Sequence, residues 1–239
     1  MTPSPVPADS LNLLCAGAAQ GLVEALRPVW LEQAGSGIAG RFGAVGAMQE
    51  ALLADEACDV FVATDKMVGE LIAAGHLRAS TRALLGRVYT AVAVRSGAHR
   101  PDVATPDALC AALLAADAIY FPDPVRSTAG IHFAGVLRSL GIADRLAAKL
   151  RPFPNGATAM RELAASGLAG AIGCTQVSEI EFTQGVECVA RLPRAFELAT
   201  PYTAAVASQA APSAQAERFV GLLTGPGSHA MREAAGFVN

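Results

Sequence analysis

The chain has 239 residues, of which 52% are hydrophobic, 16% charged and 5% aromatic. Its formal net charge of −3 gives no basic surface, and the few aromatic side chains leave little for base stacking, so we expect no nucleic-acid partner. The mean hydropathy of +0.38 comes from alanine, and because the sequence lacks an uninterrupted apolar run of about 18 residues, we expect no membrane insertion.

The N-terminal segment and the cysteines bear on the compartment. Residues 1–10 contain three prolines. They lack the basic stretch followed by an apolar stretch that a secretory signal contains. The cysteines show no paired spacing, which favours reduced thiols; they are Cys15, Cys58, Cys110, Cys174 and Cys188. We therefore expect a cytoplasmic protein, or a periplasmic one if its N-terminus has been trimmed.

Strand-like and helix-like segments alternate in the first part of the chain. Strands are predicted at Leu11–Ala16, 38–42 and 58–63. Helices are predicted at 19–33, at 47–53 and after Thr64 or Asp65, either of which can cap the helix. Three βα units in about seventy residues predict an α/β fold with a mostly parallel sheet and helices on both faces.

A second α/β set follows a long β segment at 87–95. In this set, helices are predicted at 107–114, 127–140 and 157–165, and strands at 118–121, 149–153 and 169–174. Two later strands are predicted at 186–190 and 196–207, and two final helices at 214–223 and 228–235. The segments 87–95 and 196–207 are long enough to cross between two lobes. We therefore predict lobe 1 from residues 1–95 plus 194–239 and an inserted lobe 2 from 96–193, with a ligand cleft between them.

Four loop-to-helix junctions, at 16–20, 43–46, 126–130 and 155–158, are rich in small residues. Ligands of open α/β sheets bind at the carboxyl ends of strands, where helix starts offer free N–H groups to an anion. Each junction taken alone also fits an ordinary βα turn. The set predicts an anion site whose substrate-binding residues are Ala18, Ala19, Gln20, Ala44, Val45, Arg126, Ser127, Thr128 and Asn155, with Thr175 and Gln176 after a later strand.

Several of these segments resemble the periplasmic molybdate-binding proteins. Residues 14–22 and 42–46 are similar to their first two ligand loops, and 59–66 to their Asp-(Leu/Val)-Phe-Ile-Ser-Ala-Asp strand. Asp123-Pro124 with Ala129-Gly130 resembles the third ligand segment, and Gly225-Pro226 with Gly236-Phe237 the C-terminal helix pair. The ordered series implies a two-lobed type II periplasmic-binding-protein fold, in which each lobe is a mixed, mostly parallel sheet flanked by helices and the lobes are joined by crossing strands.

The departures from that family concern the ligand. The family uses serine hydroxyls in its first two loops and a tyrosine in its second lobe, whereas this chain has Ala18, Val45 and Cys174 at or near those places. A buried oxyanion needs its lone pairs satisfied, so we expect poor binding of molybdate or tungstate. Arg126, followed by Ser127 and Thr128, favours a planar carboxylate instead, because the guanidinium fork pairs with carboxylates through two hydrogen bonds.

Three further segments resemble one branch of this superfamily, which includes aconitate isomerase and binding proteins for organic acids. They are 127–133, 171–180 and 185–187 followed by Leu192-Pro193. The resemblance implies a small di- or tricarboxylate as ligand, and an isomerase that shifts a double bond by removing and returning a proton. The alternative is a non-catalytic solute-binding protein that serves an ABC permease, if exported, for an organic acid or molybdate; a ligand-sensing domain is a third option.

Such a proton shift needs one base, and two candidates stand out. His132 in the 127–140 helix either faces the ligand or packs against a neighbouring element, and Cys174 either reacts or is an inert buried side chain. Glu179 is more simply interpreted as a carboxylate that caps a helix. We expect no metal and no cofactor, because His76, His99 and His229 lack metal-ligand spacing and no nucleotide-binding glycine loop occurs.

Overall fold

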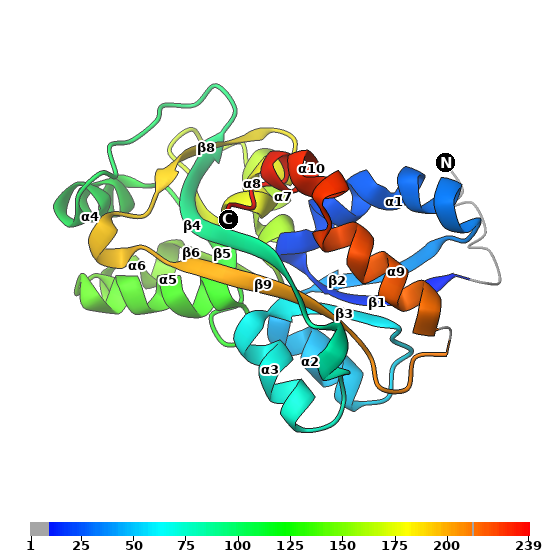
Figure 1. The fold of residues 1–239 in the computed structure, drawn as a ribbon. Coiled ribbons are helices and arrows are strands. Elements are labelled where there is room, and N and C mark those ends of the chain that lie inside the picture. Colours follow the sequence, from blue (N-terminus) through cyan, green and yellow to red (C-terminus); the bar gives the residue numbers. More distant parts are fainter. Residues whose placement is uncertain (1–9, 212) are drawn as a thin grey trace. The chain divides into compact units, whose positions relative to one another are not determined.

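The computed structural model describes residues 10–211 and 213–239, and the chain divides into two compact units (Figure 1). Unit 1 contains the chain up to Arg87 together with Pro201–Asn239, and unit 2 is the continuous stretch Val88–Thr200. The chain leaves unit 1 within β4 (Ala83–Arg95) and returns to it within β9 (Ala199–Val206). The ligand cleft expected between two lobes stays a prediction.

Unit 1 has the mostly parallel sheet that the alternating pattern predicts. β1 (Leu11–Ala16) pairs in parallel with β2 (Ile38–Gly43) and with β3 (Val60–Thr64), and β9 runs antiparallel beside β3. The helices are α1 (Gln20–Ala34), α2 (Val45–Leu53), α3 (Asp65–Ala73), α9 (Ser213–Thr224) and α10 (His229–Ala234). Figure 1 shows α1, α9 and α10 on one face of these strands and α2 and α3 on the other, which buries both faces.

Unit 2 has a mixed sheet in the order β4-β7-β5-β6, with β8 on the other side of β4. β5 (Ile119–Pro122) pairs in parallel with β6 (Leu150–Phe153) and with β7 (Ile172–Gln176), whereas β4 is antiparallel to β7 and to β8 (Val186–Arg191). The helices are α4 (Pro106–Ala115), α5 (Thr128–Ser139), α6 (Ala143–Leu146), α7 (Gly156–Ala165) and α8 (Val177–Phe182).

Two apolar clusters cover opposite faces of the unit 2 sheet. Ile119 and Phe121 belong to a cluster with Leu113 of α4 and Phe133 of α5, whereas Tyr120 between them belongs to a second cluster with Met160 of α7. This division follows from the strand period of two, which sends successive side chains to opposite faces. The helices on the two faces are thereby fixed by separate cores.

Some predicted boundaries are corrected by the structure. β4 begins at Ala83, four residues before the predicted start, and the segment predicted as a strand from 196 begins with a 3-10 turn, η4 (Arg194–Phe196), so that β9 starts only at Ala199. Among the described residues, no helix is both long and apolar enough to cross a bilayer.

Candidate ligand-binding and catalytic residues

Two helix starts in unit 1 follow neighbouring strand ends. Ala16 at the end of β1 is paired with Gly43 at the end of β2, so the turn η1 (Gly17–Ala19) and the start of α2 lie at the same sheet edge. Neither Ala16, before η1, nor Ala44, before α2, supplies a side-chain cap, whereas Thr64 Oγ1 accepts a hydrogen bond from Met67 N–H at the start of α3. The structure thus brings together the predicted residues Ala18, Ala19, Gln20, Ala44 and Val45, whose side chains are buried except for the half-buried Gln20.

The corresponding edge in unit 2 collects the ends of β5, β6 and β7, which are parallel neighbours. The Asp123 carboxylate accepts hydrogen bonds from the backbone N–H groups of Val125 (2.7 Å) and Arg126 (3.0 Å), and so shapes the turn before α5. A Cβ on Gly130 would overlap the carbonyl oxygens of Pro122 and Asp123, so glycine lets α5 start directly against the end of β5.

The residue that precedes α5 makes no side-chain cap. Ser127 is buried, its extended backbone places it at the N-cap position, and its hydroxyl makes no capping hydrogen bond. The predicted residues Arg126, Ser127 and Thr128 are therefore consecutive at a helix start that carries the positive end of the helix dipole. This arrangement suits an anion.

The other predicted residues of unit 2 are engaged with the chain itself. Asn155 Oδ1 accepts a hydrogen bond of 2.8 Å from Thr158 N–H and caps α7. Gln176 is buried, and with its amide turned so that both of its polar atoms are satisfied, its side-chain nitrogen donates to the carbonyl oxygens of Val88 (3.1 Å) and Tyr89 (3.3 Å). Thr175 is completely buried, and its hydroxyl donates to Glu179 Oε2 at 2.5 Å.

The two proton-transfer candidates have different surroundings. Cys174 packs in the apolar cluster with Phe133 and Ile119, and burial raises the pKa of its thiol. Of the two alternatives for this residue, a reactive thiol or an inert buried side chain, these surroundings favour the second. His132 is half-buried, and its Nε2 lies 2.7 Å from the carbonyl oxygen of Phe196. A carbonyl only accepts, so Nε2 of the neutral ring carries the proton and Nδ1 is the basic atom. Within the described residues, Nδ1 makes no hydrogen bond.

Glu179 is more deeply embedded than the sequence indicated. Burial raises the pKa of its carboxyl, and this effect is opposed by hydrogen bonds from Thr175 Oγ1 and from the backbone N–H groups of Ala157, Gly156 and Gln176. The bond to Gln176, the residue before α8, is the capping contact expected of a carboxylate three residues into a helix. The contacts to α7 have no signal in the sequence near Glu179, because they come from a segment more than twenty residues earlier.

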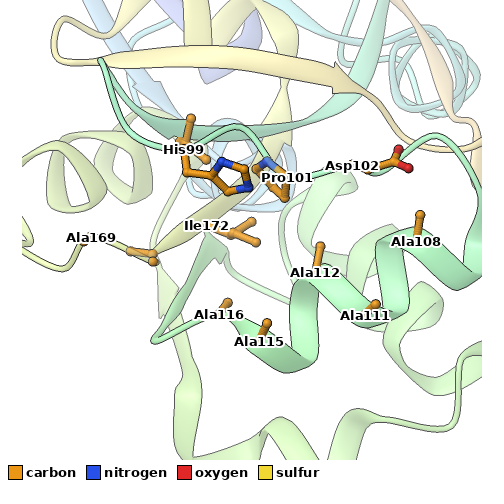
Figure 2. Close-up of a pocket in the computed structure, with 13 residues that line it drawn as sticks. His99, Pro101, Asp102, Ala108, Ala111, Ala112, Ala115, Ala116, Ala169 and Ile172 are labelled. Atoms are coloured by element: carbon orange, nitrogen blue, oxygen red, sulfur yellow. The ribbon is translucent and has the colours of Figure 1, made fainter.

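A separate cavity of about 570 Å³ opens on unit 2 (Figure 2). Figure 2 shows the alanines of α4 on one side and His99, Pro101 and Asp102 on another. Ala171 and Ile172 line it at the beginning of β7, the opposite end of that strand from Gln176. No residue of the predicted site lines this cavity. Among the described residues, no group of three or more His, Cys, Asp or Glu side chains is arranged to hold a metal ion.

The fold and these helix starts define a class of protein that binds small solutes. Residues 11–238 match the family model of bacterial extracellular solute-binding proteins, and the chain belongs to that family. It is 26% identical, over 85% of its length and 78% of the relative's, to an aconitate isomerase from a Pseudomonas species.

Solved structures show the same fold. The periplasmic molybdate-binding protein of Azotobacter vinelandii superimposes with a TM-score of 0.77 at 20% identity, covering 96% of this chain and 99% of that one. The sulfate-binding protein SubI of Mycobacterium tuberculosis superimposes with a TM-score of 0.74 at 15% identity, covering 95% of this chain and 86% of that one. The resemblance of the sequence to the molybdate-binding proteins is thereby confirmed at the level of the fold.

Proposed function

We propose that the chain binds a small unsaturated organic carboxylate and shifts its double bond, with His132 as the proton carrier. The observation that carries the catalytic part is the contact between His132 Nε2 and the Phe196 carbonyl oxygen. This contact holds the ring in one tautomer and one orientation, as the partners of catalytic histidines do. The similarity to an aconitate isomerase over most of the chain supports the same reaction class.

The proposed ligand contacts are those helix starts that lack a side-chain cap. Backbone N–H groups at Ala18 and Ala19 and at Ala44 and Val45 supply neutral donors, and Arg126 supplies the charge that pairs with a carboxylate. The backbone N–H of Gln20 donates to the Gly17 carbonyl oxygen, so this residue can offer only its side chain. Ser127 and Thr128 add hydroxyl donors. Asn155, Thr175 and Gln176 make internal hydrogen bonds, so we assign them a supporting role.

The proposed reaction balances without an oxidant, a reductant or a second substrate. Nδ1 of neutral His132 removes a proton from the carbon next to the double bond, and the electrons of that C–H bond form a new C=C bond. The negative charge spreads into the conjugated carboxylate, where Arg126 and the helix N–H groups stabilise it. The resulting imidazolium returns the proton to the far carbon of the original double bond, so one C–H bond breaks and one forms.

Incubation with cis- and trans-aconitate and related enoic acids in deuterated water tests this proposal. We expect interconversion of isomers, or deuterium incorporation at the allylic carbons, measured by proton NMR. Calorimetric titration of the same acids measures binding separately. Tight binding without exchange over several hours would reject catalysis and leave only the binding function.

That outcome is the second candidate, a non-catalytic solute-binding protein for an organic acid. Its support is the family itself, which is defined by extracellular solute binding. In that case an ABC permease is the proposed partner, and the native protein is expected outside the cytoplasm. If the isomerase proposal holds, we expect the protein in the cytoplasm; fractionation of cells that express the native gene distinguishes the two locations.

A further inference from the structure

The start of α7 contains a carboxylate that belongs to the chain. Glu179 comes from α8 and is only 5% exposed, and its Oε2 occupies the space that a Cβ on Gly156, the first residue of α7, would take. Thr175 Oγ1 donates to Oε2 at 2.5 Å. The backbone N–H groups of Gly156, Ala157 and Gln176 act in the same direction as this bond, because each lowers the pKa of the carboxyl against the effect of burial. The carboxylate therefore lies at the start of α7, where a helix favours an anion.

Asn155 binds the next two N–H groups of this helix start. The third N–H of α7, from Thr158, is bound by Asn155 Oδ1 at 2.8 Å, and the fourth, from Ala159, is bound by the Asn155 carbonyl oxygen at 3.0 Å. The α5 start differs, since Ser127 makes no side-chain cap. The starts of α5 and α7 therefore differ: that of α7 has a side-chain cap and that of α5 has none.

The backbone around Glu179 is shaped for this carboxylate. A Cβ on Gly156 would overlap both Glu179 Oε2 and Thr175 Oγ1, so the absence of a side chain at Gly156 makes the space that the carboxylate occupies. Thr183 Oγ1 donates to the Glu179 carbonyl oxygen at 2.7 Å and holds the α8 turn that presents the side chain. Together these contacts fix the carboxylate from two helices.

We propose that Glu179 is a resident carboxylate that fills an anion-binding site at the start of α7 and thereby determines which anions the chain accepts. With Glu179 in place, compact carboxylates and oxyanions are excluded from this site. The charge of an external ligand must then be held elsewhere, which we assign to the uncapped helix starts; that last step rests on the proposed function, whereas the occupied site does not.

Replacing Glu179 with alanine gives a sharp test, because the atoms removed correspond to one acetate ion. The variant keeps the donors of Thr175, Gly156, Ala157 and Gln176 but leaves them without an acceptor in a buried space, which costs stability. Acetate from solution carries the missing carboxylate and the missing carbon. An anion that binds only the folded variant raises its melting temperature.

The experiment compares the full-length chain and Glu179→Ala at pH 8, in increasing sodium acetate or sodium chloride at matched ionic strength. We expect Glu179→Ala to melt about 5 °C or more below the unsubstituted chain, and acetate but not chloride to recover a saturable part of that loss. The unsubstituted chain should not respond to acetate. Met160→Ala, which opens an apolar space in the neighbouring cluster, should melt lower without any recovery.

Equal effects of acetate and chloride on Glu179→Ala would overturn the proposal. If that variant does not fold, Glu179→Gln decides the matter, because it keeps the shape and puts an amide N–H group against the existing donors. We expect Glu179→Gln to melt below the unsubstituted chain and to ignore acetate; an unchanged melting temperature would contradict the resident carboxylate. Absence of organic-acid binding by the unsubstituted chain would reject the proposed function but leave the acetate result intact.

Discussion

His132 in α5 and Phe196 in the turn before β9 are joined by a hydrogen bond of 2.7 Å from the imidazole Nε2 to the main-chain carbonyl oxygen. The two residues are 64 positions apart in the sequence, so this bond ties α5 to a distant turn of unit 2. It also leaves Nδ1 as the basic atom of the ring. A structural role and a chemical role therefore belong to different nitrogens, which allows substitutions to separate them.

We expect His132→Gln to retain stability but to lose isomer exchange by about 10²–10⁴-fold, since the glutamine amide can donate to Phe196 but cannot carry a proton between carbons. His132→Ala should lose the same exchange and also about 1 kcal/mol of unfolding free energy. NMR exchange and urea denaturation measure the two effects. Exchange at the original rate in His132→Gln would show that another residue is the base.

Cys174 should behave as part of the core. We expect Cys174→Ala to keep exchange within about twofold and to cost about 1–2 kcal/mol of unfolding free energy, because the cavity left behind lies in the apolar cluster with Phe133. The assay is the same deuterium exchange, measured on protein shown to be folded by circular dichroism. Loss of deuterium exchange in the folded variant would indicate that Cys174 is the base.

Arg126 should set the affinity for the ligand. Arg126→Ala is expected to weaken binding of an organic acid about tenfold or more, because a charge-assisted hydrogen bond contributes about 1.5–3 kcal/mol. Arg126→Lys keeps the charge but cannot form the two parallel hydrogen bonds of a guanidinium, so this variant should bind the acid more weakly than the unsubstituted chain and more tightly than Arg126→Ala. Arg145→Ala, an exposed arginine of α6, is the control and should leave the calorimetric affinity unchanged. Equal affinities in all four proteins would remove Arg126 from the site.

Gly156→Ala should disturb the resident carboxylate through sterics alone. The added methyl group overlaps Glu179 and Thr175, and overpacking of this kind costs about 1–3 kcal/mol of unfolding free energy. Gly135→Ala in α5 is the matched control: its nearest neighbour is the flexible end of Arg138 at 3.9 Å, and we expect a gain of about 0.5–1 kcal/mol from helix propensity. Thermal unfolding of both variants measures the difference. Similar changes of melting temperature in Gly156→Ala and Gly135→Ala would contradict the steric overlap at Gly156.

Asp65 should stabilise unit 1 at neutral pH but not in strong acid. Hydrogen bonds from Arg82 and from Thr203 Oγ1 lower the pKa of its carboxyl below the ordinary value of 3.8. Because the folded pKa is the lower one, this contribution is fully present above about pH 4 and is lost as the pH falls through the folded pKa. Asp65→Asn should therefore flatten the acid limb of a stability-against-pH curve, whereas the exposed Asp144→Asn should not. An unchanged acid limb in Asp65→Asn would contradict the assignment.

The sequence predicted the elements better than the contacts. The alternation of short apolar runs and helical spacing located β1, β3 and α5 closely, because those signals are local. The roles of Glu179 and His132 were not visible in the same way, since their partners, Gly156 and Phe196, lie on other elements. Cys174 illustrates the limit: the sequence predicted a strand that ends at this residue, whereas β7 runs from Ile172 to Gln176 and Cys174 lies in its middle, inside the apolar cluster with Phe133.

The division of the chain has a consequence for its synthesis on the ribosome. Unit 2 is one continuous stretch, Val88–Thr200, so it is synthesised completely before the 39 residues Pro201–Asn239. Unit 1 needs the antiparallel partner of β3 and the packing of Phe219 against Trp30, both supplied by those last residues. We therefore expect the middle of the polypeptide to become protease-resistant first, while its N-terminal third waits for release of the C-terminus. Truncation before β9 should leave unit 1 sensitive to protease and unit 2 protected.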